Sequence, residues 1–224
     1  MAFIHSTRDF GIQNLEVSTT PQGRKYTTPE GKQYPSITTV LGHGNKEWLQ
    51  EWRDRVGHAE ADKISRFAAN RGTELHDCLE KYLDNETVPK MMPMARSGFN
   101  KISRYLDKNL GEIWAQEVPL YSNYLRLAGR VDLIAELNGS VAIIDFKTSR
   151  KIKKKEWIED YFLQMTAYSI MWEERTGIPI SKLVIIMDVD YHAPRVFIEK
   201  RDNWANKLIT RIRDYEDDIK ALSL

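Results

Sequence analysis

Two aspartates and a lysine flank a tight turn in the second half of the chain. Asp132 precedes the dipeptide Asn138-Gly139, and Asp145 and Lys147 follow it. Asn-Gly between apolar runs predicts a two-residue hairpin loop, because both residues tolerate the positive φ angles of a type I′ turn. In that register Asp132 faces Asp145, and Arg130 faces Lys147.

Facing carboxylates in a sheet repel each other, and here the neighbouring residues of both strands are apolar, so the strands are predicted to be central and buried. The two-residue period of a strand puts Lys147 on the same face as Asp145. Two carboxylates and a lysine on one face predict a divalent-metal active site with a cationic helper. The alternative is an ordinary hairpin with its aspartates nearer the strand ends, since a one-residue change in turn length would break the register.

A histidine on a predicted helix is a candidate nitrogen ligand for that metal. Gly72, His76 and Glu80 are spaced four residues apart and share one helix face. Glu80 could orient His76 or bind the metal through water, whereas Gly72 would let a backbone or a phosphate approach closely. Taken alone, a His-Glu pair on a helix is more often simply solvated.

Three further side chains have both a functional and a structural interpretation. Glu117, on the strand before the hairpin, is either a third carboxylate at the site or a glutamate on an edge strand. Gln164 and Tyr168 lie one helical turn apart. They could bind phosphate oxygens or hold the neighbours of Lys147, or Tyr168 could simply be half-buried with a satisfied hydroxyl.

A basic segment follows the second strand of the hairpin directly, at residues 150–155. Such runs are commonly solvated loops, but this one would lie near a bound nucleic-acid backbone. The candidate phosphate-binding lysines are Lys151, Lys153 and Lys154. Among the six tryptophans, Trp48, Trp52 and Trp157 are candidates for stacking on unpaired bases, although most aromatic residues are expected in the core.

Composition narrows the classes of protein. The net charge of +1 excludes a polybasic coat for nucleic acid, so binding to a polyanion must depend on locally arranged charge. The single cysteine, Cys78, excludes an internal disulfide and a four-cysteine metal or iron–sulfur site. No apolar run is long enough to span a bilayer, and the N-terminus lacks a signal-peptide core. We therefore expect no membrane association and a reducing, cytoplasm-like compartment.

The hydrophobic pattern predicts a mixed α/β (α+β) fold with a central β-sheet flanked by helices. We expect a single domain over 1–224, in which a mostly helical part, 1–110, precedes a sheet core, 111–224. Ser36 should cap a helical turn that breaks at 42–45, and Asp202 should cap the last helix. Predicted helices cover 46–56, 59–83, 94–110, 156–176 and 202–221; predicted strands cover 113–121, 127–137, 141–148, 183–190 and 195–200, and 1–35 is irregular or contains a small hairpin.

The ordered set of His76, Asp132, Asp145-Phe146-Lys147 and Gln164-x-x-x-Tyr168 resembles the PD-(D/E)XK nucleases, in particular their RecB-like exonuclease branch. The resemblance covers about residues 71–168 and includes Arg71-Gly-Thr before the histidine. The segment 35–41 is similar to compact members such as phage exonucleases and mitochondrial genome maintenance exonucleases. Some relatives carry an iron–sulfur cluster and others a fused helicase, and this chain differs from both.

The resemblance implies a restriction-endonuclease-like core that cleaves DNA phosphodiesters with one or two Mg²⁺ or Mn²⁺ ions. His76, Asp132, Asp145 and the Phe146 carbonyl would hold the metal, and Lys147 would position or deprotonate a water or offset negative charge. Gln164, Tyr168, Arg71 and the basic segment would bind the strand backbone. Glu80 and Glu117 would lie behind the metal ligands.

The expected function is a DNA exonuclease acting on single-stranded ends in replication, recombination or repair, in a bacterial or phage-infected cell. The helical part, 36–110, would form an arch or wall that admits a free strand, and a helicase or recombination partner would supply any motor. The alternatives are a structure-selective endonuclease, a catalytically idle DNA-binding subunit and an unrelated metal-binding hydrolase. The complete Asp-Asp-Lys set argues against the idle subunit.

Overall fold

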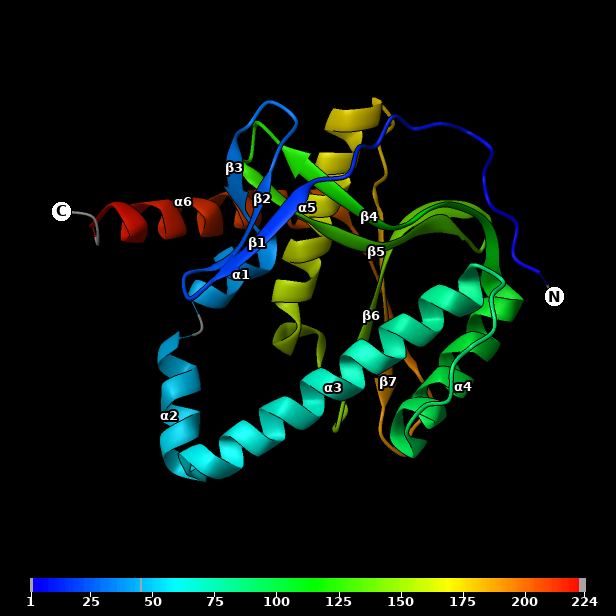
Figure 1. The fold of residues 1–224 in the computed structure, drawn as a ribbon, viewed down its shortest axis with the longest axis horizontal. Coiled ribbons are helices and arrows are strands. Elements are labelled where there is room, and N and C mark those ends of the chain that lie inside the picture. Colours follow the sequence, from blue (N-terminus) through cyan, green and yellow to red (C-terminus); the bar gives the residue numbers. More distant parts are fainter. Residues whose placement is uncertain (1, 45, 222–224) are drawn as a thin grey trace.

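A five-stranded mixed sheet forms the centre of the molecule in the computed structural model, which describes residues 2–44 and 46–221 (Figure 1). The strands are paired in chain order, antiparallel except for a parallel pair, β6 and β7. The helix between these two strands provides the crossover that a parallel pair requires. The predicted mixed α/β fold is confirmed. The strands are β4 (Leu110–Ser122), β5 (Leu127–Leu137), β6 (Ser140–Ser149), β7 (Lys182–Val189) and β8 (Arg195–Lys200).

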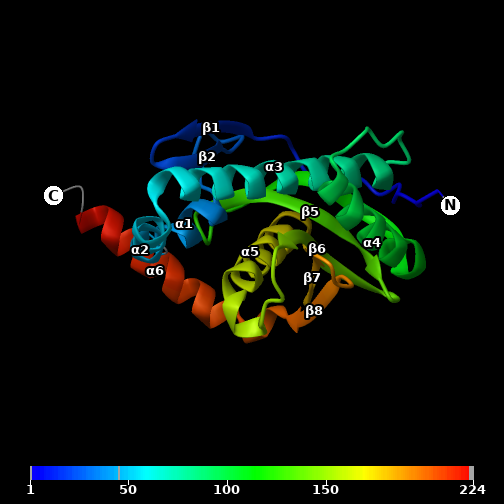
Figure 2. The ribbon, with the colours of Figure 1, turned by 90° about the horizontal axis from the view of Figure 1, so that it is seen from below.

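Helices cover both faces of the sheet, and each face has its own apolar core. Figure 2 shows α3 on one side of the sheet and α5 on the other. Side chains from α3 and α4 pack against one face, and side chains from α1, α5 and α6 pack against the other. The helices are α1 (Ile37–His43), α2 (Lys46–Val56), α3 (His58–Leu83), α4 (Pro93–Asn109), α5 (Glu159–Thr176) and α6 (Ala205–Ala221), with 3₁₀ turns η1 (Lys155–Trp157) and η2 (Arg201–Asn203).

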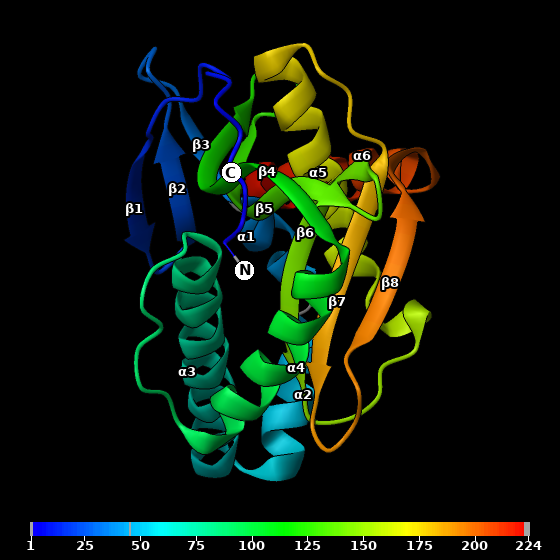
Figure 3. The ribbon, with the colours of Figure 1, turned by 90° about the vertical axis from the view of Figure 1, so that its right-hand side faces the viewer.

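The N-terminal segment forms a second sheet, larger than the small hairpin predicted there. Its antiparallel strands are β1 (Glu16–Thr20), β2 (Gly23–Thr27) and β3 (Gln33–Pro35) (Figure 3). Tyr26 and Tyr34 of this sheet are buried in a cluster with Tyr121 and Ala128 of the main sheet. The N-terminal sheet is therefore fixed beside β4 and β5.

The predicted hairpin register is confirmed as far as β5 and β6 remain paired. Asn138 and Gly139 have φ angles of 53° and 75°, and the pairing runs from Leu137 and Ser140 to Leu133 and Ile144. Beyond that point β5 continues beside β4, and β6 continues beside β7. The expected Asp132–Asp145 and Arg130–Lys147 pairs would therefore fall past the last paired residues of the hairpin.

Several element boundaries differ from the sequence-based prediction. Helix α5 begins at Glu159 because residues 155–157 form a 3₁₀ turn, and Asp202 lies in η2 instead of capping α6. Ser36 does cap α1, since its Oγ accepts a hydrogen bond from the Thr39 amide at 3.0 Å. Asn45, at the end of the predicted break, lies outside the described residues.

Helix α3 carries the only cysteine of the sequence, Cys78, whose thiol is buried with 1% exposure. In the part of the chain that the structure describes, no helix is sufficiently long and apolar to cross a membrane.

Candidate functional site

Strand β6 presents two residues of the predicted site on the face covered by α5. The Lys147 ammonium lies 2.8 Å and 2.7 Å from the two carboxylate oxygens of Asp145. Asp145 is 1% exposed, so this carboxylate is removed from water and needs a nearby cation. The prediction that both side chains share one face is confirmed.

Helix α5 adds an amide and a phenol to this pair. Gln164 donates from Nε2 to Asp145 Oδ1 at 3.3 Å and to the Tyr168 hydroxyl at 3.1 Å. Its Oε1 accepts from Lys147 Nζ at 3.5 Å. The structure thus places Gln164 and Tyr168 where they hold the neighbours of Lys147, one of the roles considered for them.

Helix α3 brings His76 to the same place from the opposite face. Its Nε2 lies 2.9 Å from the Phe146 carbonyl oxygen, and its Nδ1 lies 3.5 Å from Asp132 Oδ2. A carbonyl can only accept, so Nε2 carries a hydrogen, and in the neutral ring Nδ1 then offers a lone pair. Asp132 Oδ2 in turn accepts from the Phe146 amide at 2.9 Å. His76 and Asp132 are therefore both fixed on the backbone of Phe146.

Glu117 lies across β4 and β5 from Asp132, because its neighbours Gln116 and Val118 pair with Leu133 and Val131. Its φ angle is 48°, in the left-handed region that a side chain with a Cβ enters only at a cost. Strained backbone of this kind is concentrated at functional sites. From the sequence, Glu117 could be either a site residue or a glutamate on an edge strand, because no residue type predicts this backbone conformation.

A histidine and two carboxylates are close enough together to share one cation. Each of His76, Glu117 and Asp132 offers a ligand atom, and these atoms lie within 4.8 Å of one another. One imidazole nitrogen and two carboxylate oxygens suit a divalent metal with open positions. This donor set fits the metal that the sequence predicts.

The structure groups the ligands differently from the prediction. Glu117 joins His76 and Asp132, while Asp145 contacts Lys147 and the Phe146 carbonyl contacts His76. Direct metal ligation by Asp145 and by the Phe146 carbonyl stays a prediction.

Electrostatics at this site favour a bound cation. Burial, with the neighbouring Asp132 and Glu80 carboxylates, raises the pKa of Glu117 to about 8. Burial also raises the pKa of Asp145, and Asp132 adds to that effect while Lys147 opposes it. Burial by itself would lower the pKa of Lys147, but the Asp145 and Asp132 carboxylates raise it above its usual value. Lys147 is thus an ammonium. Its single positive charge is too little to balance the neighbouring carboxylates, so a bound cation would stabilise them.

A cavity of about 460 Å³ opens onto these groups. Glu80, predicted to lie behind the metal ligands, lines this cavity. The N-terminal sheet and α1 form a further wall of the cavity, which was not predicted from the sequence. The cavity-lining residues that were not predicted are Arg24, Tyr26, Ser36, Thr38, Thr73, Asp77, Gly129 and Arg130.

Arg71 lies elsewhere, although the sequence placed it on the substrate backbone. Its guanidinium is buried and paired with Asp188 and, at 2.5 Å, with Asp190, at the end of β7. Lys101 of α4 also contacts Asp188. This network joins α3 and α4 to β7. The positive charge of Arg71, which was predicted to bind phosphate, is paired with these aspartates. Sequence could not reveal it because the partners are 117 residues apart.

The basic segment leads from β6 towards η1 and is largely exposed. Lys151 and Lys154 are exposed, Lys153 is half-buried, and Lys154 lies over the Trp157 ring at 5.5 Å. Trp48 and Trp157 are 62% and 63% exposed and line one hollow, whereas Trp52 is half-buried. Contact of these residues with nucleic acid stays a prediction.

Comparison with known proteins identifies the family of this chain. Residues 90–221, more than half of the chain, match the family model of the PD-(D/E)XK nuclease superfamily. The chain belongs to the PD-(D/E)XK nuclease superfamily. Nucleases of this superfamily depend on divalent metals, which agrees with the donor set of His76, Glu117 and Asp132.

Curated relatives of the chain include mitochondrial genome maintenance exonuclease 1 from Homo sapiens and from Mus musculus. The human protein is 27% identical over an alignment of 177 residues, and the match covers 71% of this chain and 51% of the relative. The mouse protein is 26% identical over an alignment of 130 residues, and the match covers 53% of this chain and 38% of the relative. The chain thus spans about half the length of these relatives or less.

Among solved structures, that of SSO0001 aligns with 80% of this chain and 73% of its own length. The sequence identity is 12% and the TM-score is 0.41.

Proposed function

We propose that this protein is a divalent-metal-dependent DNA exonuclease that hydrolyses phosphodiester bonds from single-stranded ends. The observation that carries the proposal is the meeting of two groups in one cavity: the His76–Glu117–Asp132 cluster and Lys147 with Gln164. Membership of a nuclease superfamily and similarity to an exonuclease support it. Replication, recombination or repair of DNA is the proposed setting.

His76, Glu117 and Asp132 would hold Mg²⁺ or Mn²⁺, as one ion or as part of a pair. Bound there, the ion would supply an activated water and offset negative charge on the phosphate. Asp145 and the Phe146 carbonyl are proposed as further ligands. Both adjoin the Phe146 amide, which donates a hydrogen bond to Asp132.

Lys147 would act as a cation in this reaction. Two contacts to Asp145 and one to Gln164 hold its ammonium at the cavity, where it can orient a water or stabilise charge on the phosphate. Tyr168 is 3% exposed and fixes Gln164 through its hydroxyl. We therefore assign Lys147 a direct role, and we assign Gln164 and Tyr168 the positioning of Lys147 and Asp145.

The proposed preference for single-stranded ends rests on the shape of the helical part. Between His58 and Asn70 nearly every residue of α3 is exposed, and α2 and this half of α3 project from the sheet (Figure 1). Such a projection would serve as the arch or wall that admits a free strand. A helicase or recombination partner would supply unwinding where the substrate is duplex.

A digestion experiment tests the proposal directly. Linear single-stranded, duplex, flapped and branched DNA, labelled separately at each end, are incubated with Mg²⁺, with Mn²⁺ and with EDTA. We expect metal-dependent loss of the single strand from one end, absent in Asp145→Asn and retained in Asp214→Asn, which changes an exposed carboxylate on α6.

Each other outcome would change the assignment. Cleavage of an internal flap or junction without loss from ends would identify a structure-selective endonuclease. Metal binding and DNA binding without any cleavage would identify an idle subunit. Undiminished cleavage by Asp145→Asn would refute the proposed active site.

A further inference from the structure

One wall of the cavity takes no part in the metal cluster or in the Lys147 network. It is formed by β2, α1 and the start of β5, and it carries Arg24, Ser36, Thr38 and Arg130. These residues are polar or cationic, in contrast to the carboxylates of the α3 side, where Asp77 and Glu80 lie. The two sides of the cavity therefore differ in charge.

Hydrogen bonds show that this wall is continuous. The Ser36 amide donates to the Arg24 carbonyl at 2.8 Å, and Ser36 also forms a bridge with Ala128 of β5. Arg130 follows two residues later on β5 and therefore points to the same side of the strand as Ala128. Arg24 and Arg130 thus come from adjacent backbone segments that Ser36 joins.

Neither the guanidinium of Arg24 nor that of Arg130 forms a close ion pair within the described residues. Within residues 2–44 and 46–221, no ion pair or side-chain hydrogen bond involves the guanidinium of Arg24 or of Arg130. Both residues are exposed at the cavity, and Arg130 lies near enough to Glu117 for its charge to oppose the rise in the pKa of that carboxyl. By contrast, Arg71 is buried against two aspartates. Two arginines without an ion pair, beside a cluster of candidate metal ligands, supply positive charge to the cavity.

Hydroxyl groups complete the wall, and the adjoining backbone leaves room for a ligand. Ser36 Oγ shares hydrogen bonds with the hydroxyls of Thr38, at 2.9 Å, and Thr39, at 2.8 Å. Thr38 is exposed at the cavity. On the facing helix, a Cβ at Gly72 would meet nothing within 4 Å. An anionic group would find guanidinium and hydroxyl donors on one wall and open space opposite.

We propose that Arg24 and Arg130, with the Thr38 hydroxyl, bind a phosphate of the nucleic-acid strand next to the phosphate that is cleaved. Guanidinium groups match phosphate oxygens in geometry and charge, and such contacts position a strand without reading its sequence. The inference rests on the proposed nuclease function and adds a second contact point to it. The phosphate could be an internal diester or the monoester at a strand end.

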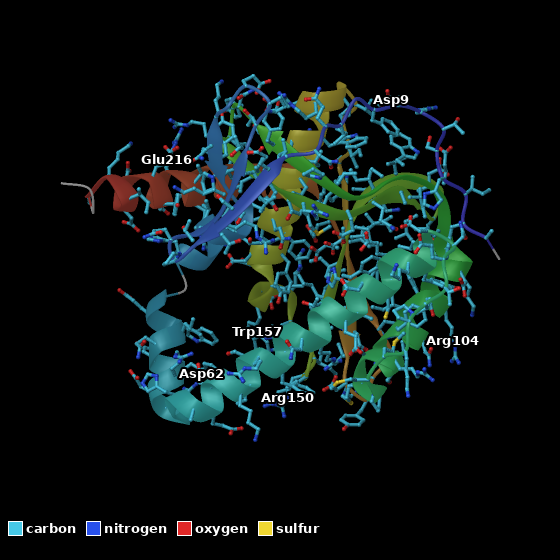
Figure 4. The ribbon with its side chains drawn as sticks, viewed as in Figure 1. Asp9, Asp62, Arg104, Arg150, Trp157 and Glu216 are labelled. Carbon is cyan, nitrogen blue, oxygen red and sulfur yellow. The ribbon has the colours of Figure 1, made fainter. Side chains whose placement is uncertain are left out.

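Salt-dependent binding tests the inference. Binding of short oligothymidylates to the full chain carrying Asp145→Asn is measured with Mg²⁺ over a range of salt concentrations. The oligothymidylates carry a 5′-phosphate, a 3′-phosphate or only hydroxyl ends. Arg24→Gln and Arg130→Gln are each added to that background. Arg104→Gln is the matched control, because Arg104 is exposed on α4, away from the N-terminal sheet (Figure 4).

We expect Arg24→Gln and Arg130→Gln each to weaken binding roughly tenfold. Because both arginines contact the same phosphate, each variant should lower the slope of log Kd against log salt by up to about 0.7, the value for one phosphate contact on a single strand. If the bound group is an internal diester, the affinity for all three oligothymidylates falls by the same factor. If it is a terminal monoester, one phosphorylated end binds more tightly than the hydroxyl end, and that difference disappears in Arg24→Gln and Arg130→Gln.

Slopes and affinities equal to those of Arg104→Gln would overturn the inference while leaving the nuclease proposal intact, provided that the unmodified protein still cleaves DNA. Absence of both cleavage and binding in the unmodified protein would refute the proposed function itself. Thermal melting of each variant shows whether the fold is retained.

Discussion

The ammonium of Lys147 meets both oxygens of a carboxylate that is 1% exposed. Because the neighbouring aspartates raise its pKa, Lys147 is charged before any substrate arrives. A permanently charged lysine is better suited to offsetting phosphate charge than to removing a proton. We therefore propose separate roles: Lys147 would supply charge, and the His76–Glu117–Asp132 group would supply ligands.

Lys147→Met keeps most of the side-chain volume and removes the charge. We expect cleavage to fall by at least about 100-fold, a typical effect for a group that acts at the reacting atoms. Asp145, left without its cation, should become protonated instead of unfolding the protein. Single-turnover cleavage and thermal melting measure the two effects. Lys108→Met on α4 is the exposed control, and equal rates for the two variants would remove Lys147 from the mechanism.

Glu117 combines a strained backbone with a ligand position, so its replacement should separate stability from metal binding. Glu117→Gly relieves the cost of a φ angle of 48° and removes a carboxylate that Asp132 repels. We expect the metal-free protein to gain about 1 kcal/mol in free energy of unfolding. Affinity for Mn²⁺, measured by calorimetry, should fall at the same time.

Glu117→Gln is the matched comparison, because it retains the strained backbone and loses only the ability to ionise and bind the metal as a carboxylate. It should lose metal affinity without the full gain in stability. A Glu117→Gly protein that binds Mn²⁺ as tightly as the unmodified chain would show that Glu117 is not a ligand.

The sequence showed which side chains of the candidate site lie together where contacts are local, and it did not show contacts between distant parts of the chain. Asp145 and Lys147 lie two residues apart on one strand, so strand periodicity suffices to bring them together. Arg71 was placed on the substrate because its partners at the end of β7 are far along the chain. Arg24 escaped notice for the same reason, since it reaches the cavity only when the N-terminal sheet docks beside β5.

At the scale of elements, the junction of α3, α4 and β7 depends on close approach. A Cβ at Gly98 of α4 would lie 2.5 Å from Asp188 Oδ2, and Asp188 is the carboxylate that both Arg71 and Lys101 contact. Helix α3 also carries His76, so this junction helps to set the distance between His76 and the sheet.

Gly98→Ala should therefore destabilise the protein by about 1–3 kcal/mol through overpacking against a buried ion pair. Gly42→Ala on α1 is the control, because a Cβ there meets nothing within 4 Å. Chemical denaturation measures both changes. Equal stability of the two variants would mean that α4 can shift away from β7 without cost.

Helices and strands with strong periodicity were predicted closely, and the small elements were not. The α2, β5 and β8 ranges agree with the sequence-based prediction residue for residue. The two 3₁₀ turns shift the starts of α5 and α6, because a tighter turn leaves the apolar spacing almost unchanged. The β1–β2–β3 sheet was underestimated because β1 is exposed along its whole length and has no alternating pattern.

At the scale of the whole molecule, the projecting α2 and the first half of α3 bear on how DNA enters. If they form an arch around the strand, a substrate without ends cannot be threaded. We expect linear single-stranded DNA to be degraded and a circular strand of the same sequence to survive under identical conditions. Cutting the circle once should restore degradation. A circle digested as fast as the linear strand would refute threading.

Cys78 gives the molecule a built-in chemical probe. It is the only thiol of the sequence, it is buried in α3, and it follows His76 by two residues. A thiol reagent can reach it only when the packing around this part of α3 opens, so the rate of labelling reports how often the segment that carries His76 opens. Binding of Mn²⁺ should slow labelling, and the logarithm of the rate should fall in proportion to the free energy with which the ion holds α3 in place. The same protein, without any engineered cysteine, can thus report separately on the opening of its helix and on the cutting of its substrate.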